Sequence, residues 1–171
     1  MNSRIAAVSI IAFALLQTPF LFTPPDHSHT WRQCDTAAIA RNYYEEDNQI
    51  FFPRIDVRGG ETDGVTGMEF PFYSYLVYLS YEILGFHHGI GKGVSLVFAL
   101  ASLVLCRLWV RGIAGHMLAD VATVTLASST LFFAYASKTL PEMTALCLHF
   151  AALVCFQRAI PDTNTPPRCY L

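Results

Sequence analysis

The apolar residues of this chain gather into blocks about as long as a membrane is thick, and this grouping limits the possible folds more than any other feature. Four blocks qualify: Ile5 to Phe22, Gly93 to Val110, Met117 to Ala136 and Met143 to Gln157. A helix of about 20 apolar residues crosses the hydrocarbon layer of a bilayer. We therefore predict an all-α membrane protein with about four transmembrane helices.

The composition agrees with this prediction. Hydrophobic residues make up 53% of the 171 residues, charged residues make up only 14%, and the mean hydropathy is +0.38. A soluble domain of this size usually carries about 25% charged residues. The formal net charge is −2 and the basic residues are dispersed along the chain, so we expect no nucleic-acid partner.

The first apolar block has two interpretations, a cleaved signal peptide and a permanent anchor. Arg4 stands before the block, and the apolar run continues to Phe22. The sequence Thr23-Pro24-Pro25 that follows lacks the small residues of a cleavage site. We interpret the block as an uncleaved anchor whose amino terminus lies in the cytoplasm.

A fifth apolar stretch, Phe70 to Phe86, decides the topology. It contains four tyrosines and Glu82, which favour the membrane surface over the hydrocarbon layer. If it lies along the surface, five arginines fall on the cytoplasmic side: Arg4, Arg107, Arg111, Arg158 and Arg168. If it crosses, that side holds three basic residues: Arg4, Lys92 and Lys138. The positive-inside rule favours the surface helix, which places residues 138–142 on the same side as the long polar loop.

That loop, residues 23–92, is predicted to carry the chemistry. We expect one or two juxtamembrane helices in it, the first from about Asp35 to Glu46 with Asp35 or Thr36 as its N-cap. Three acids have simple structural explanations: Asp35 as a helix cap, Glu69 as a solvated loop acid and Glu142 as a residue favoured at a helix start. Together, acids and arginines at one membrane surface suit an anionic lipid-linked substrate and a general base.

Four short runs carry a resemblance to a known family. They are HTWRQCDTAAIARNYY at residues 29–44, FPRID at residues 52–56, EFP at residues 69–71 and SKTLPE at residues 137–142. Together they resemble bacterial multi-pass glycosyltransferases of the GT-C superfamily, more narrowly the protein-mannosyltransferase-like and aminoarabinose-transferase-like branch. The resemblance covers roughly residues 4–160, and the WRQxDT run is its most specific part.

The resemblance implies an enzyme that transfers a sugar from a polyprenyl-phosphate carrier to a lipid, glycan or protein acceptor at the outer face of the membrane, with inversion. Asp35 matches the aspartate that acts as general base in such enzymes. Glu69 and Glu142 match the second and third acidic positions, which shape the site or, with Asp35, help to hold a divalent metal cation. The candidate groups for binding the phosphate are Arg54 and Lys138, followed by Arg32 and Arg41.

The length differs from that of the family, whose members have more crossings and often a soluble C-terminal domain. This chain has 171 residues and ends in a polar tail at residues 161–171. We therefore expect residues 1–160 to be the amino-terminal part of a longer transferase domain, inactive alone, in a bacterial inner membrane with the first loop periplasmic or extracellular. Two other interpretations stay open: a non-catalytic membrane subunit that keeps the fold, and a transporter fragment, although transporters place polar groups at mid-bilayer.

Overall fold

The computed structural model describes residues 4–25, 29–60, 62–67 and 69–159. The all-α prediction is confirmed for these residues, which contain no strand and one isolated β-bridge, between Arg54 and Val65. The elements are α1 (Arg4–Gln17), the 3-10 helix η1 (Thr18–Phe22), α2 (Thr30–Glu45), α3 (Phe72–Leu84), α4 (Gly89–Ala127), α5 (Thr130–Tyr135) and α6 (Glu142–Ala159). The tail predicted at residues 161–171 lies outside the described residues.

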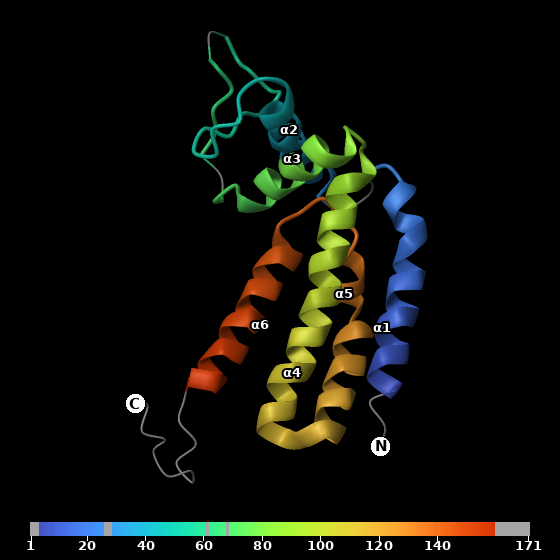
Figure 1. Cartoon of the computed structure of the whole chain (residues 1–171). Coiled ribbons are helices and arrows are strands. Elements are labelled where there is room, and N and C mark those ends of the chain that lie inside the picture. The colour runs from blue at the N-terminus through green and yellow to red at the C-terminus, as the bar shows by residue number, and fades with distance from the viewer. Residues whose placement is uncertain (1–3, 26–28, 61, 68, 160–171) are drawn as a thin grey trace.

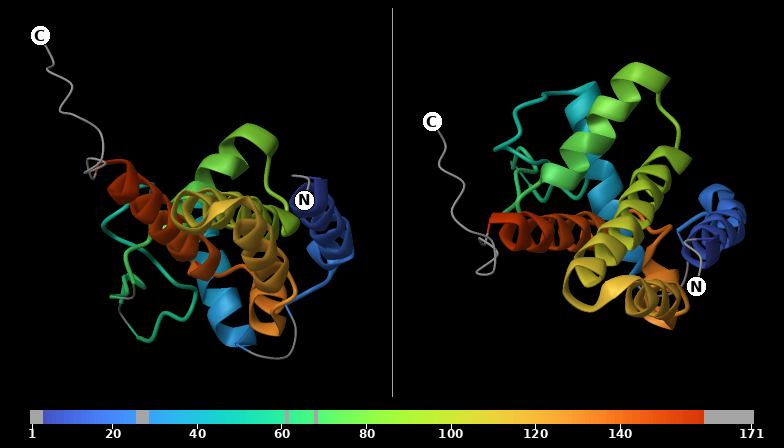
Figure 2. Two further views of the ribbon diagram at one scale, coloured as in Figure 1. Left: turned by 90° about the horizontal axis from the view of Figure 1, so that it is seen from below. Right: turned by 60° about the horizontal axis from the view of Figure 1, so that its bottom comes forward.

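Helices α1, α4, α5 and α6 form a bundle whose members run side by side (Figures 1 and 2). Two segments of this bundle, Ile5–Phe22 and Gly89–Ala127, are long and apolar enough to cross a membrane. Many large apolar side chains on the outside of the bundle are exposed, among them Val8, Leu15, Val97, Leu131 and Phe156. Such a surface is typical of helices that face lipid.

Helix α4 consists of two antiparallel limbs because its path reverses at Gly115. This residue has φ 82° and ψ 179°, a conformation that is essentially restricted to glycine. Nε of Arg107 on the first limb donates a hydrogen bond to Oδ1 of Asp120 on the second limb over 2.8 Å. The reversal predicted between Val110 and Met117 is therefore confirmed (Figure 1).

The first limb of α4 and helix α6 run in the same direction. At one end Gly91 packs so closely on Thr139 that a Cβ would lie 2.7 Å from the Cγ2 of the threonine. At the other end Gly112 packs on Gln157 and leaves no room for a Cβ. The beginning of α1 and the end of α6 therefore share one end of the bundle, and residues 138–142 lie at the other end (Figure 1).

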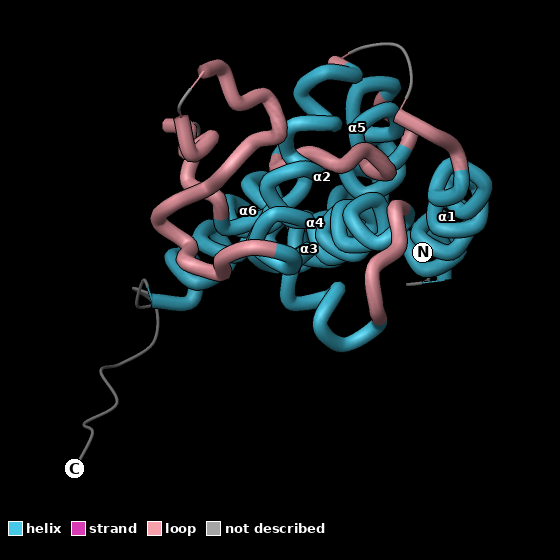
Figure 3. The backbone as a smooth tube through the Cα atoms, turned by 90° about the horizontal axis from the view of Figure 1, so that it is seen from above, coloured by secondary structure: helices cyan, strands magenta, loops and turns pink. Residues whose placement is uncertain are grey.

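Residues 23–88, which we call the cap, cover the end of the bundle at which residues 138–142 lie. Helices α2 and α3 pack together and cross above the end of α4 (Figures 1 and 3). Two clusters of buried side chains join them: Ala40, Tyr73, Val77 and Tyr81 in one, and Ile39, Tyr43 and Tyr78 in the other. Helix α3 does not run alongside the bundle, and so residues 138–142 meet the cap, as the surface-helix topology predicts.

Lys92 ties the first turn of α4 to the end of η1. Its side chain is 5% exposed, and Nζ donates to the carbonyl oxygens of Phe20 at 3.1 Å and Thr23 at 2.6 Å. The last carbonyls of a helix have no partner inside the helix, so a cation near them is favourable. This contact fixes where the chain leaves the bundle and enters the cap.

The predicted start of the first cap helix is wrong. Helix α2 begins at Thr30 with His29 as the N-cap residue, so Asp35 and Thr36 lie inside the helix and neither caps it. The hydroxyl of Thr36 donates to the carbonyl of Arg32 one turn earlier at 2.7 Å, which is a contact of a helix interior. Residues 30–34 contain no proline or glycine, so nothing stops the helix from extending toward the amino terminus.

Candidate functional site

Arg32 binds two carboxylates that are far away in the sequence. Its Nη1 donates to Oε1 of Glu142 at 2.6 Å, and its Nη2 donates to Oε1 of Glu69 at 2.8 Å. Glu142 follows Arg32 by 110 positions and Glu69 follows it by 37. The three side chains come from α2, from the loop before α3 and from the start of α6. We call this set the Arg32 cluster.

The local sequence favours each of these positions. Arg32 lies in the first turn of α2, and Glu69 stands two residues before Pro71, the N-cap of α3. Glu142 lies in the first turn of α6, directly after Pro141, where a carboxylate is stabilised by the positive end of the helix dipole. The predicted position of Glu142 at a helix start is confirmed, and the same carboxylate also takes part in the ion pair with Arg32.

A buried hydrogen-bond network holds the turn that delivers Glu142. The hydroxyl of Ser95 on α4 donates to the carbonyl of Lys138 at 2.6 Å. The hydroxyl of Tyr73 on α3 lies 2.9 Å from that of Ser95 and donates to the carbonyl of Gly91 at 2.7 Å. Burial raises the pKa of Tyr73, so its hydroxyl stays protonated and available as a donor. The network therefore joins α3, α4 and the turn before α6.

The electrostatics of the Arg32 cluster favour its ionised form. The hydrogen bond to Glu69 raises the pKa of Arg32 above its ordinary value, although burial works against it. Partial burial alone would raise the pKa of Glu69, but the hydrogen bond and the charge of Arg32 outweigh burial and lower it. One guanidinium faces two carboxylates, so the cluster keeps a net negative charge.

A cavity of about 430 Å³ opens beside the Arg32 cluster. Arg32, Glu69 and Glu142 form its charged wall, and Phe72 and Leu148 are among its apolar lining residues. Small-molecule sites commonly have volumes of about 300–1,000 Å³ with a few polar groups in a largely apolar wall. The cavity has this size and this mixture of groups.

Asp35, the predicted general base, lies one helical turn after Arg32 on α2 and is partly exposed. Residues three apart on a helix lie on the same face, so its carboxylate and the guanidinium of Arg32 share one side of α2. Asp35 does not line the 430 Å³ cavity. Among the described residues it has no hydrogen-bond or ion-pair partner, which leaves the carboxylate open to solvent or substrate.

The structure does not bring the other predicted phosphate-binding groups into the Arg32 cluster. Nη2 of Arg41 donates to Oδ2 of Asp56 at 2.6 Å, and Nη1 of Arg54 donates to Oδ2 of Asp47 at 3.2 Å. Both arginines therefore hold the loop that follows α2 inside the cap. Lys138 precedes Glu142 in the same turn, with its Nζ 5.9 Å from the ring centroid of Tyr135. Of the four basic candidates, Arg32 is the one whose described ion pairs are with Glu69 and Glu142.

The metal predicted at Asp35, Glu69 and Glu142 can be compared with this geometry. Nowhere in the described part of the chain are three His, Cys, Asp or Glu side chains grouped as metal ligands. Glu69 and Glu142 each have one oxygen bound to Arg32, and Asp35 does not line the cavity that these two acids border. In this arrangement the three acids do not fit a divalent cation.

Tyr73 and Ser95 were missed by the sequence analysis. A tyrosine in a row of four and a serine inside an apolar helix carry no signal of their own, because their partners are backbone carbonyls of distant residues. The buried serine of a membrane-type helix is the one available hint, since such a hydroxyl needs a partner.

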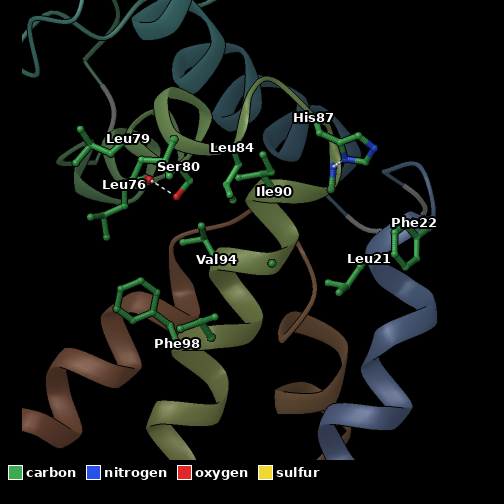
Figure 4. A pocket seen from close by; sticks show the side chains of 14 residues that line it. Leu21, Phe22, Leu76, Leu79, Ser80, Leu84, His87, Ile90, Val94 and Phe98 are labelled. Atoms are coloured by element: carbon green, nitrogen blue, oxygen red, sulfur yellow. Dashed lines mark hydrogen bonds between the residues drawn. The ribbon is translucent and has the colours of Figure 1, made fainter.

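A second hollow, of about 670 Å³, lies between α3, η1 and the first limb of α4 (Figure 4). Leu21, Leu76, Val94 and Phe98 are among the side chains that line it, and no charged residue does. The hydroxyl of Ser80 donates to the carbonyl of Leu76 at 2.9 Å, so this polar group is already satisfied within α3. The groove therefore offers a hydrocarbon surface, in contrast to the charged wall beside Arg32.

Comparison of the chain with protein-family models, curated proteins and solved structures found no match in any of the three.

Proposed function

We propose that this chain is a multi-pass membrane glycosyltransferase, or the amino-terminal part of one. It would take a sugar from a polyprenyl-phosphate donor and transfer it to a lipid, glycan or protein acceptor at the non-cytoplasmic face of a bacterial inner membrane. The observation that carries the proposal is the Arg32 cluster, which joins three of the four sequence runs that resemble GT-C enzymes, beside a cavity at one end of an apolar bundle.

The membrane topology in this proposal has four crossings: α1 with η1, the two limbs of α4, the second continued by α5, and α6. The packing of the first helix supports an anchor. Phe13 of α1 lies in the core of the bundle, and Nε2 of Gln17 donates to the carbonyl of Phe133 at 2.6 Å. A segment that packs in this way contributes to the fold, which a cleaved signal peptide does not.

The distribution of charge supports a non-cytoplasmic cap. The cap contains ten of the 13 acidic residues and four of the 11 basic residues of the chain. All four cap arginines are ion-paired with acids: Arg32, Arg41, Arg54 and Arg58. Outside the cap, the basic residues at the cap end of the bundle are Lys92 and Lys138, whereas the opposite end carries Arg4, Arg107, Arg111 and Arg158. The positive-inside rule counts Lys and Arg in the short segments next to the membrane, and four against two favours the cytoplasm for the opposite end.

The proposed chemistry is a single displacement at the anomeric carbon. The oxygen or nitrogen of the acceptor forms a bond to this carbon while the bond from the carbon to the phosphate oxygen breaks. The carboxylate of Asp35 takes the proton of the acceptor, and the phosphate leaves with the electrons of the broken bond. A guanidinium near the leaving phosphate stabilises the charge that develops there, and Arg32 is the nearest such group to Asp35 along α2.

The hydrocarbon groove between α3, η1 and α4 supports the lipid part of the proposal. Helix α3 borders both hollows, with Phe72 and Tyr73 at the charged cavity and Leu76 and Leu79 one turn further along at the groove. A donor with a charged head and an isoprenoid tail needs both kinds of surface. The two lie on one helix at the membrane end of the cap.

The test uses the whole chain in lipid nanodiscs with a radiolabelled polyprenyl-phosphate sugar and measures both donor retention and sugar transfer. We expect Asp35→Asn to retain the donor and to lose transfer by about 10²- to 10⁴-fold, the usual contribution of a general base. Asp63→Asn is the matched control, because Asp63 is an exposed cap acid outside the Arg32 cluster. Equal transfer by Asp35→Asn and wild type would remove the catalytic assignment. A chain that does not retain the donor would favour the non-catalytic subunit, whereas retention without transfer is what an amino-terminal part that is inactive alone would give.

A further inference from the structure

Arg32 occupies the place between two carboxylates that a divalent cation commonly takes in proteins. The oxygens of Glu69 and Glu142 lie 2.8 Å and 2.6 Å from the two terminal nitrogens of one guanidinium. These acids belong to different elements, and no other basic residue in the described ranges forms an ion pair with either of them. Without a cation between them, two carboxylates repel each other.

A guanidinium and a divalent cation satisfy such a pair differently. The guanidinium carries a single charge, stays protonated at any physiological pH and donates two parallel hydrogen bonds. A divalent cation needs its oxygen ligands at about 2.0–2.6 Å and requires several of them. Arg32 here engages one oxygen of each carboxylate, so neither Glu69 nor Glu142 has both oxygens available to a metal ion.

We propose that Arg32 is a built-in cation: it holds Glu69 and Glu142 together in place of a divalent metal, and the site is complete without metal. The corollary is that loss of the guanidinium leaves two carboxylates aimed at one point beside an open cavity. That pair then binds a divalent cation. The inference concerns the same site as the proposed function, but metal binding is measured without turnover, so either one can fail alone.

The experiment is a titration of the whole chain in detergent micelles with Mn²⁺, followed by the loss of the free-ion signal in electron paramagnetic resonance. We expect wild type and Arg32→Lys to show no Mn²⁺ binding that depends on Glu142. We expect Arg32→Gln to bind Mn²⁺ at least about tenfold more tightly than wild type, because the number and charge of the ligands set the affinity. The double variant Arg32→Gln with Glu142→Gln loses this gain.

Arg58→Gln is the matched control, because Arg58 pairs with the single carboxylate of Glu46 in the cap and its removal frees only one ligand. No gain in Mn²⁺ affinity for Arg32→Gln, in a sample whose thermal unfolding stays cooperative, overturns the proposal. If Arg32→Gln does not fold, the Mn²⁺ binding of wild type is compared with that of Glu142→Gln instead. Equal Mn²⁺ binding by these two supports the proposal, and weaker binding by Glu142→Gln overturns it, since it means that the native site already takes metal.

Discussion

Two arginines hold carboxylates at opposite ends of this molecule, and their surroundings differ. Arg32 spans 37 and 110 positions to reach two acids beside a cavity, and the three side chains are 28%, 43% and 32% exposed. Arg107 reaches one acid, Asp120, across the turn between the limbs of α4. Asp120 is only 1% exposed, and no cavity that we describe includes this pair.

The difference separates an ion pair that can take part in chemistry from one that holds a fold. The Arg32 cluster is open to solvent, so its ion pairs contribute little to stability, while its charges are accessible to a ligand. The Arg107–Asp120 pair is out of reach of a ligand, and Nη2 of Arg107 and Oδ2 of Asp120 are both buried without partners. Breaking that pair leaves an unpaired buried charge, which is costly.

The largest effect that we predict on stability follows from Asp120→Asn. Removing the carboxylate leaves Arg107, whose side chain is only 16% exposed, without a counter-charge, and the expected loss is about 3–5 kcal/mol in the free energy of unfolding. Thermal unfolding in detergent micelles measures it. The double variant Arg107→Met with Asp120→Met restores most of the lost stability, because no buried charge remains.

Arg111→Gln, at an exposed position without a described partner, is expected to leave the unfolding temperature unchanged. A mild effect of Asp120→Asn would show that water reaches this pair and would remove the contrast with Arg32.

A smaller effect is predicted for Ser95→Ala, which tests how the bundle positions the Arg32 cluster. The substitution removes the hydrogen bonds of the Ser95 hydroxyl to the carbonyl of Lys138 and to the hydroxyl of Tyr73, although that carbonyl still accepts from the N–H of Leu140. We expect a loss of about 0.5–1.5 kcal/mol, the usual net contribution of a hydrogen bond. Because the network holds the turn before α6, hydrogen exchange at residues 138–142 should accelerate.

Ser102→Ala is the matched control for Ser95→Ala. Ser102 is also fully buried on α4, but its hydroxyl donates to the carbonyl of Phe98 in the same helix at 2.8 Å. We expect its exchange pattern at residues 138–142 to match wild type. Equal acceleration in both variants would show that the turn responds to bundle stability in general, and the positioning role of Ser95 would be lost.

The helical bundle could be predicted from the sequence because its information is local. The apolar blocks define helices and the reversal at Gly115 lies between two of them, but the block from Met117 to Ala136 is divided between the second limb of α4 and α5. The start of α2 at Thr30 could not be predicted in the same way, because Asp35 is a residue type that commonly caps helices and His29, which occupies the N-cap position, is not.

The candidate site was predicted in part. Glu69 and Glu142 were named from the sequence and the structure brings both to Arg32, whereas Asp35 does not line the cavity. The meeting of residues 138–142 with the cap followed from the topology. The leading role among the basic residues was given to Arg54 and Lys138, whereas the described ion pairs of Glu69 and Glu142 are with Arg32. Arg54 pairs with Asp47, which is only seven positions away in the sequence. Charge alone does not indicate whether an arginine will pair with such a local acid or with a distant one.

The smallest predicted effect is the loss of stability of the Arg32 cluster at acidic pH. It tests whether this cluster, unlike the Arg107–Asp120 pair, is accessible to solvent. The pKa of Glu69 is lowered in the folded state from an ordinary value of 4.5. Its ion pair therefore contributes stability above pH 4.5, and the contribution is lost as the pH falls through the folded-state pKa. Because the side chains are partly exposed, we expect only about 0–1 kcal/mol.

Thermal unfolding of wild type and Glu69→Gln, measured from neutral pH downward, should show a gap in unfolding temperature that closes in acid. Glu82→Gln, at an exposed position of α3, is expected to show no such gap. A gap between wild type and Glu69→Gln that persists at the lowest pH would mean that Glu69 acts through packing and that its ion pair with Arg32 adds nothing measurable.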